Sequence, residues 1–171
     1  MRRKVAFLDR DGVINRDYAY VHRWEDFDFV PGAVAAMRRL HAAGWDLVIV
    51  TNQSGIARGR YTEAQYQRLR EQMLAALAAA GVPVLGVYHC PHHPQGKVPE
   101  LAVTCECRKP APGLLLQAAR EHHIDLASAC LIGDRPSDIT AGRRAGLQAC
   151  YQVCSENPES PEASNPATGQ G

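Results

Sequence analysis

The sequence lacks the features that mark nucleic-acid-binding and membrane proteins. Its 171 residues carry a formal net charge of +1, so no overall field attracts nucleic acid or an anionic membrane. No apolar run approaches the length of a membrane span, and Asp9 and Arg10 interrupt the first run. The basic start Arg2-Arg3-Lys4 is followed by too few apolar residues for a secretory signal. We therefore expect a cytoplasmic protein with no nucleic-acid or membrane partner.

Motifs for several common ligand and nucleophile sites are also missing. The sequence has no GxxxxGK(S/T) loop, no GxGxxG turn and no GxSxG elbow. Asp9 and Asp11 could open a calcium loop, but Val13 and Ile14 stand where an EF-hand needs an oxygen ligand and a glycine. These absences exclude a P-loop nucleotide site and an EF-hand.

Short apolar runs alternate with stretches of helical periodicity along the chain. Strands are predicted at 5–8, 47–50, 84–88, 130–132 and 147–153, and helices at 33–43, 62–81, 112–122 and 137–145. This alternation predicts βαβ units and a parallel sheet. The strands are continuously apolar rather than alternating, which is typical of a sheet covered by helices on both faces. The fold class is therefore α/β.

The composition changes sharply near the C-terminus. Residues 155–171 contain no aromatic residue and no aliphatic residue larger than alanine. Such a segment cannot bury enough apolar surface to offset its loss of conformational entropy. We expect one domain over residues 1–154 and a disordered tail over residues 155–171.

Polar and acidic residues follow three of the predicted strands. Asp9 and Asp11 follow the first, "TNQSG" from Thr51 follows the second, and Asp134 follows the fourth. The carboxyl ends of parallel strands meet at one edge, where ligands bind in such sheets. Converging carboxylates with nearby basic residues favour a Mg²⁺ and phosphate site. Taken singly, each stretch is also compatible with an ordinary turn or helix cap.

Cysteine and histidine residues cluster between residues 90 and 107. Cys90 and His92 are followed by Cys105 and Cys107, a Cys₃His set suited to a structural zinc ion. Reduced thiols without a metal are the alternative, and His89 or His93 could replace His92. The other cysteines are expected to be small core residues. A zinc ion at Cys107 would fix the direction of the two cations that follow it, Arg108 and Lys109.

Four motifs together resemble the haloacid dehalogenase superfamily of phosphohydrolases. They are "FLDRDG", "VTNQSG", "CRKPAPG" and "IGDRPSD", in this order, and "CPHHPQG" with its cysteines resembles the zinc subfamily related to histidinol-phosphate phosphatase. The resemblance covers about Val5 to Val153. It implies a Rossmann-like core without a cap domain, in which a zinc-stapled loop covers the site.

The resemblance also implies roles for individual residues. Asp9 would be the nucleophile that forms an aspartyl-phosphate, and Asp11 the general acid and base. Thr51 and Lys109 would stabilise the phosphoryl oxygens. Catalytic Mg²⁺ would be held by Asp9, the backbone carbonyl of Asp11, and Asp134.

The remaining implied site residues would contact the substrate. They are Asp17, Tyr20, Asn52, Gln53, Ser54 and Arg108. Arg108 would bind the distal part of the substrate, and Asp138 would orient Lys109 or nearby water. One departure from the pattern of the resembled family is Arg135, which follows Asp134 where that pattern usually has lysine.

The implied activity is that of a monomeric, Mg²⁺-dependent sugar bisphosphate phosphatase with structural Zn²⁺. The expected substrate is heptose 1,7-bisphosphate, which would lose its 7-phosphate in the pathway to nucleotide-heptose and surface glycans. Histidinol phosphate is the alternative substrate. The guanidinium of Arg108 favours a second anionic group over the cationic amine of histidinol phosphate. A binding module that has lost catalysis is disfavoured because the acidic residues and Lys109 are intact.

Overall fold

A five-stranded, wholly parallel sheet forms the centre of the molecule, in the order β3-β2-β1-β4-β5. The computed structural model describes residues 3–154, so the predicted tail at 155–171 lies outside the described residues. The strands are β1 (Val5–Leu8), β2 (Asp46–Asn52), β3 (Gly86–Cys90), β4 (Cys130–Gly133) and β5 (Ala149–Gln152). The predicted parallel α/β sheet is therefore confirmed.

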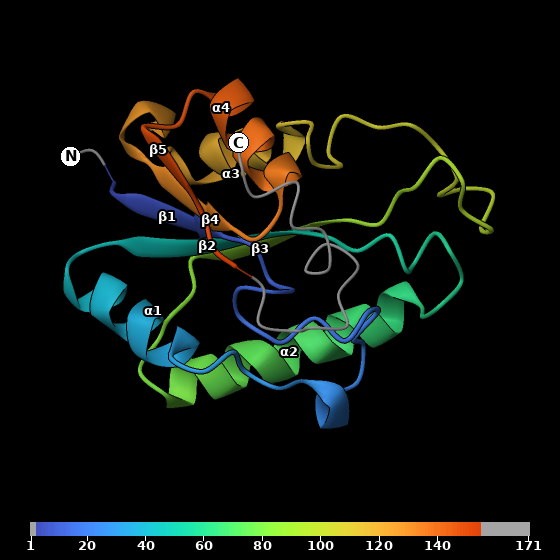
Figure 1. Cartoon of the computed structure of the whole chain (residues 1–171), viewed down its shortest axis with the longest axis horizontal. Helices are drawn as coiled ribbons and strands as arrows, with labels where there is room; N and C mark the ends of the chain where they lie inside the picture. The colour runs from blue at the N-terminus through green and yellow to red at the C-terminus, as the bar shows by residue number, and fades with distance from the viewer. Residues whose placement is uncertain (1–2, 155–171) are drawn as a thin grey trace.

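Helices cover both faces of this sheet (Figure 1). They are α1 (Ala33–Ala42), α2 (Glu63–Ala79), α3 (Gly113–His122) and α4 (Pro136–Ala145), with short 3₁₀ turns η1 (Trp24–Asp26) and η2 (Leu126–Ser128). Helices α1 and α2 lie on one face, and α3 and α4 on the other. Helix α2 begins with a capping box, in which Thr62 and Gln65 each accept the other's backbone N–H. No helix within residues 3–154 has the length and apolarity needed to cross a membrane.

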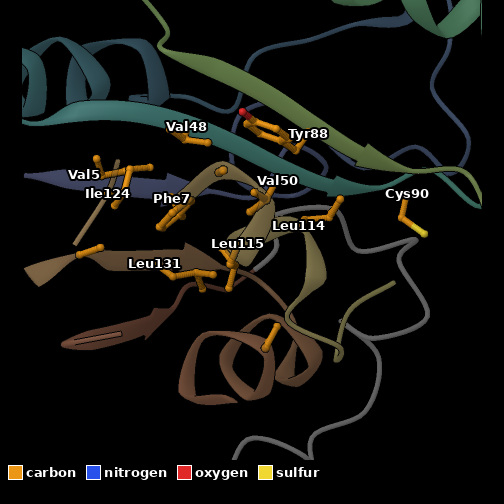
Figure 2. Packing of buried hydrophobic residues seen from close by; sticks show 13 residues of the cluster. Val5, Phe7, Val48, Val50, Tyr88, Cys90, Leu114, Leu115, Ile124 and Leu131 are labelled. Carbon is orange, nitrogen blue, oxygen red and sulfur yellow. The ribbon is translucent and has the colours of Figure 1, made fainter. Parts of the chain in front are cut away.

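Alternate residues of each strand fill two separate cores. Val5 and Phe7 of β1 point toward α3 and α4, where they pack with Leu115 (Figure 2). Ala6 and Leu8 point the opposite way, toward α1 and α2. Because both faces of the central strands are buried, β1 is apolar throughout and β2 is apolar over residues 47–50.

Two strand boundaries differ from the prediction in a way that matters for the site. Strand β2 continues past Val50, so Thr51 and Asn52 are its last residues rather than the loop after it. They stay in the ladder because Thr51 pairs with His89 and Asn52 with Cys90 of β3. Strand β3 correspondingly begins at Gly86 and ends at Cys90. Polar residues were assigned to loops by composition, but the neighbouring strand supplies their backbone partners.

The strand order reverses beside β1. The chain passes from β1 to β2 and β3 on one side, then crosses to β4 and β5 on the other. The crevice at the carboxyl ends of β1 and β4 is the usual ligand position in such sheets. The segments that follow β1, β2, β3 and β4 extend from this same edge (Figure 1).

Candidate active site

A buried lysine joins two aspartates at the edge of the sheet. The Lys109 ammonium donates to Asp9 Oδ1 at 3.0 Å, to the carbonyl of Val50 at 3.1 Å, and to Asp138 Oδ1. The backbone N–H of Arg10 donates to the same Asp9 oxygen at 2.9 Å. Asp138 Oδ2 accepts from the backbone N–H of Arg135 at 3.1 Å, which fixes this carboxylate at the start of α4. The expected contact between Asp138 and Lys109 is present.

The charges at this point shift one another's pKa. Burial raises the pKa of Asp9, although Lys109 opposes the shift. Burial alone would lower the pKa of Lys109, but Asp9 and Asp138 outweigh it and raise that pKa above its usual value. Burial also raises the pKa of Asp134 to about 6. The lysine therefore stays charged among several carboxylates that repel one another.

Asp134 is placed where a cation could bind. One oxygen each of Asp9, Asp134 and Asp138 lie within 4.8 Å of one another. Asp134 Oδ1 is buried and has no hydrogen-bond partner among the described residues. A Cβ on Gly12, whose φ is +88°, would lie 2.0 Å from Asp134 Oδ2, so only glycine lets the two segments approach this closely. Since both oxygens of Asp138 are already bonded, Asp9 and Asp134 are the better pair for a hard cation such as Mg²⁺.

Asp11 is held by side chains rather than by the sheet. Its Oδ1 accepts from Arg10 at 2.8 Å and from Asn15 at 3.0 Å, and its Oδ2 accepts from Gln53 Nε2 at 3.1 Å. Burial acts to raise the pKa of Asp11, but Arg10 and these hydrogen bonds outweigh it and hold the pKa below its usual value. Asp9 and Asp11 thus have opposite pKa shifts although one residue separates them.

Gln53 links Asp11 to two further side chains. Its Nε2 also donates to Thr51 Oγ1 at 2.9 Å, and its Oε1 accepts from the hydroxyl of Tyr61. Burial raises the pKa of Tyr61, so its hydroxyl stays protonated and acts as the donor. Because both ends of the Gln53 amide have partners inside the protein, this residue is placed to position Asp11.

A cavity of about 480 Å³ opens above these groups. Most of the residues predicted for catalysis and substrate binding line it: Asp9, Asp11, Asp17, Tyr20, Asn52, Gln53, Ser54, Arg108 and Lys109. Thr51 and Asp134 are buried and are not among its lining residues. Arg135 lines the cavity too and pairs with Asp17 at 3.1 Å.

The four predicted zinc ligands come together in the segment that follows β3, residues 90–109, called here the cysteine–histidine loop. One ligand atom each of Cys90, His92, Cys105 and Cys107 lies within 4.8 Å of the others. Cys105 Sγ lies 3.5 Å from Cys90 Sγ, and His92 Nδ1 lies 3.3 Å from Cys107 Sγ. Sulfurs bound at about 2.3 Å to one tetrahedral ion are separated by a little under ~4 Å, and Cys107 Sγ is closer than this to Cys90 Sγ, at 2.8 Å. The kind and number of donors, three sulfurs and one imidazole nitrogen, therefore carry the fit to zinc.

The neighbouring histidines have other partners. His89 faces Glu63 at 2.8 Å and packs against Tyr66, and His93 faces Arg58 at 2.9 Å. This leaves His92 as the imidazole in the cluster. The backbone N–H of Arg108 also points at Cys105 Sγ, at 3.3 Å, which ties the cluster to the cavity wall.

Comparison with known proteins identifies the family. A family model described as HAD-hydrolase-like matches residues 106–157. D-glycero-β-D-manno-heptose-1,7-bisphosphate 7-phosphatase of Escherichia coli K12 is 49% identical over 94% of this chain and 84% of its own length. The chain belongs to the heptose bisphosphate phosphatases of the haloacid dehalogenase superfamily. It is therefore a phosphoric monoester hydrolase.

Other heptose bisphosphate phosphatases are similar over nearly the whole domain. A Photorhabdus laumondii relative named for the α anomer of the same substrate is 46% identical over 95% of this chain and 88% of its own length. The structure of D,D-heptose 1,7-bisphosphate phosphatase from B. bronchiseptica, complexed with magnesium and phosphate, superposes with a TM-score of 0.77. It is 38% identical and covers 88% of this chain and 80% of that one. The family resemblance inferred from the motifs is confirmed.

Several contacts in this phosphatase were not predicted. Arg10 was given no role by the sequence, yet it bonds Asp11 and the carbonyl of Val21. The hydrogen bonds of Asn15 and Tyr61 to Asp11 and Gln53 also escaped prediction, since they depend on how the loops fold back. The one available signal was the charge of Arg10 directly between two aspartates.

Proposed function

We propose that the chain removes the 7-phosphate of D-glycero-D-manno-heptose 1,7-bisphosphate, as the names of its relatives indicate for them. The proposal depends chiefly on 49% identity to one such enzyme over almost the whole domain. Nucleotide-heptose synthesis for surface glycans is the proposed pathway, and a cytoplasmic monomer is the proposed state. Because relatives carry both α and β names, the preferred anomer at C1 is left open.

Asp9 is proposed as the nucleophile. Both hydrogen bonds that it accepts end on Oδ1, from Lys109 and from the backbone of Arg10, which leaves Oδ2 for attack on phosphorus. As the Oδ2–phosphorus bond forms, the bond from phosphorus to the sugar oxygen breaks, and an aspartyl-phosphate results. Lys109 is placed to stabilise the charge that develops on the phosphoryl oxygens.

Asp11 is proposed to move the protons. In the structure its bonds to Arg10, Asn15 and Gln53 favour the carboxylate, the form that takes a proton from the hydrolytic water in the second step. In the first step it must give a proton to the leaving sugar oxygen. The negative charge of an incoming phosphate raises the pKa of a nearby carboxyl group, so substrate binding itself favours that protonation.

Metal ions complete the proposal. Asp9 and Asp134, with the backbone carbonyl of Asp11, would hold Mg²⁺, which when bound neutralises charge between the nucleophile and the phosphate. Cys90, His92, Cys105 and Cys107 would hold structural Zn²⁺. Asp17, Tyr20, Asn52, Ser54 and Arg108 would contact the sugar and its distal phosphate.

Phosphate release from three substrates tests this function. Release is measured in the presence of Mg²⁺, with and without EDTA. The substrates are heptose 1,7-bisphosphate, histidinol phosphate and fructose 1,6-bisphosphate. We expect selective, Mg²⁺-dependent loss of the 7-phosphate. A preference for histidinol phosphate would refute the heptose assignment, and equal rates on all three would leave only a general phosphatase.

A further inference from the structure

Two arginines that line the cavity lack the partners that arginines normally have. Arg58 and Arg108 both line the cavity. Neither forms an ion pair with an acidic side chain in the described part of the chain. The Nε atom of each is buried and has no hydrogen-bond partner among residues 3–154. Buried donors of this kind are costly unless an acceptor reaches them.

The one polar neighbour of the Arg58 guanidinium cannot satisfy it fully. Arg58 Nη2 lies 2.9 Å from His93 Nε2, while His93 Nδ1 faces the backbone N–H of Gln95 at 3.0 Å. A neutral imidazole has one accepting nitrogen, so it can accept from one of these donors and not from both. Arg58 is left with more donors than the protein around it has acceptors.

Two loops bring these arginines together. Arg58 lies in the segment that follows β2, and Arg108 in the cysteine–histidine loop. The carbonyl of Ala57 joins the loops, since it accepts from the backbone N–H of Lys97 at 2.7 Å and of Val98 at 2.9 Å. A side chain on Gly96 would clash with this contact, because its Cβ would lie 2.8 Å from the Ala57 oxygen. Arg58 is thus held beside the same loop that carries Arg108.

Other arginines near the site are already engaged. Arg10 is buried against Asp11, Arg135 pairs with Asp17, and Arg60 stacks on the ring of Tyr20 at 5.0 Å. Arg10 and Arg135 thus have acidic partners, and Arg60 has an aromatic one. The excess of unbalanced positive charge in the cavity wall is therefore concentrated at Arg58 and Arg108.

We propose that Arg58 is a specificity-determining residue, which binds the second phosphate of the substrate together with Arg108. This inference rests on the proposed function and deepens it. Two guanidinium groups offer a planar array of donors that matches a phosphate dianion, and the phosphate would supply the acceptors that both Nε atoms lack. The same pair disfavours a substrate with a cationic amine at that position.

The test compares a bisphosphate with the monophosphate that lacks the distal group. For Arg58→Gln, we expect kcat/KM for heptose 1,7-bisphosphate to fall about 100-fold, mainly through KM, as for loss of one member of a desolvated charge pair. With heptose 7-phosphate, kcat/KM should be unchanged. Arg58→Lys should recover part of the loss, because it keeps the charge without the bidentate geometry. Lys97→Gln removes a charge from the neighbouring loop outside the cavity and should change neither substrate's kinetics.

The outcomes separate the alternatives. Equal loss on both substrates by Arg58→Gln and Arg58→Lys would show that Arg58 is structural, and no loss on either would show that it does not bind substrate. Fructose 1,6-bisphosphate and fructose 6-phosphate form a second pair that does not depend on the heptose. The enzyme could prefer fructose 1,6-bisphosphate over fructose 6-phosphate, lose this preference in Arg58→Gln, and show no activity on the heptose. That result would overturn the proposed function but support phosphate binding by the two arginines. Wild-type protein with no preference for either bisphosphate would overturn the arginine site.

Discussion

The two groups of candidate metal ligands are held in place by different means. Asp9 and Asp134 directly follow β1 and β4, and the parallel ladder fixes their backbones before any ion arrives. In the cysteine–histidine loop only Cys90 belongs to a strand, and the segment from His92 to Cys107 has neither helix nor strand. The carboxylate site is thus preorganised by the sheet, whereas the thiolate site would depend on a bound ion for order. Substitutions at the carboxylate site should therefore lower the catalytic rate, whereas substitutions among the thiolates should disorder the cysteine–histidine loop.

The largest expected effect is at Asp9. Asp9→Asn removes the proposed nucleophile and should lower kcat by about 10⁴-fold or more. Stability should not fall, because the change relieves repulsion with Asp134 and Asp138, and Lys109 keeps Asp138 as its partner. Steady-state kinetics and thermal unfolding of the same preparation check both statements. Full activity in the variant would rule out the covalent mechanism.

Asp138 should matter most for stability. Asp138→Asn removes one of the two carboxylates that pair with the buried Lys109 ammonium. The free energy of unfolding should fall by about 3 kcal/mol. Denaturant unfolding measures this. With Lys109→Met already present, the same change should cost little or reverse its sign, because Asp138 then only adds to the repulsion among carboxylates. Additive losses would mean that the two residues do not act as a pair.

How far the sequence predicts this arrangement depends on what fixes each residue. The sites of Asp9 and Asp134 were predictable, because apolar strands imply a parallel sheet and its topology brings the strand ends together. The grouping of Cys90 with Cys107 was also predictable from ligand chemistry and spacing. The inclusion of Thr51 in β2 was not predictable, because it depends on pairing with β3, which lies far along the chain.

The roles of loop side chains were the hardest to predict. Gln53 lines the cavity, where it is predicted to contact substrate, but its bonds to Asp11, Thr51 and Tyr61 were not foreseen. The contact of Arg58 with His93 joins two loops whose relative position no local pattern encodes. Side-chain directions in such loops follow from tertiary packing, which neither periodicity nor motif spacing reports.

A smaller and more local effect is expected at the zinc cluster. Cys107→Ser should release zinc and raise the KM for the bisphosphate roughly 10–100-fold, as for loss of a supporting metal interaction. Hydrogen exchange should rise in residues 92–107 and stay unchanged in β1 and β4. Lys109 should keep its place because Asn52 Oδ1 accepts its backbone N–H at 3.0 Å, so kcat on a small aryl phosphate should change little. Cys154→Ser, an exposed cysteine outside the cluster, is the matched control.

Uniform loosening of the sheet in Cys107→Ser would contradict this division between the two regions. It would mean that the thiolate cluster supports the whole fold rather than one loop. Zinc content per chain, measured on the same samples, distinguishes loss of the ion from loss of the cysteine alone. If the variant retained its zinc and its KM, the ligand assignment would be wrong.

The smallest expected effect is at Tyr61, which tests a third way of holding a carboxylate. The position of the Asp11 carboxylate depends on loop side chains. The Gln53 amide donates to Asp11, and the Tyr61 hydroxyl fixes that amide by donating to its oxygen. Tyr61→Phe removes one buried hydrogen bond and should cost about 1 kcal/mol of stability. The freed amide can turn its oxygen toward Asp11, so kcat should fall several-fold while KM stays the same. A rise in KM without a change in kcat would instead place Tyr61 in substrate binding, and would show that Asp11 is held well enough by Arg10 and Asn15.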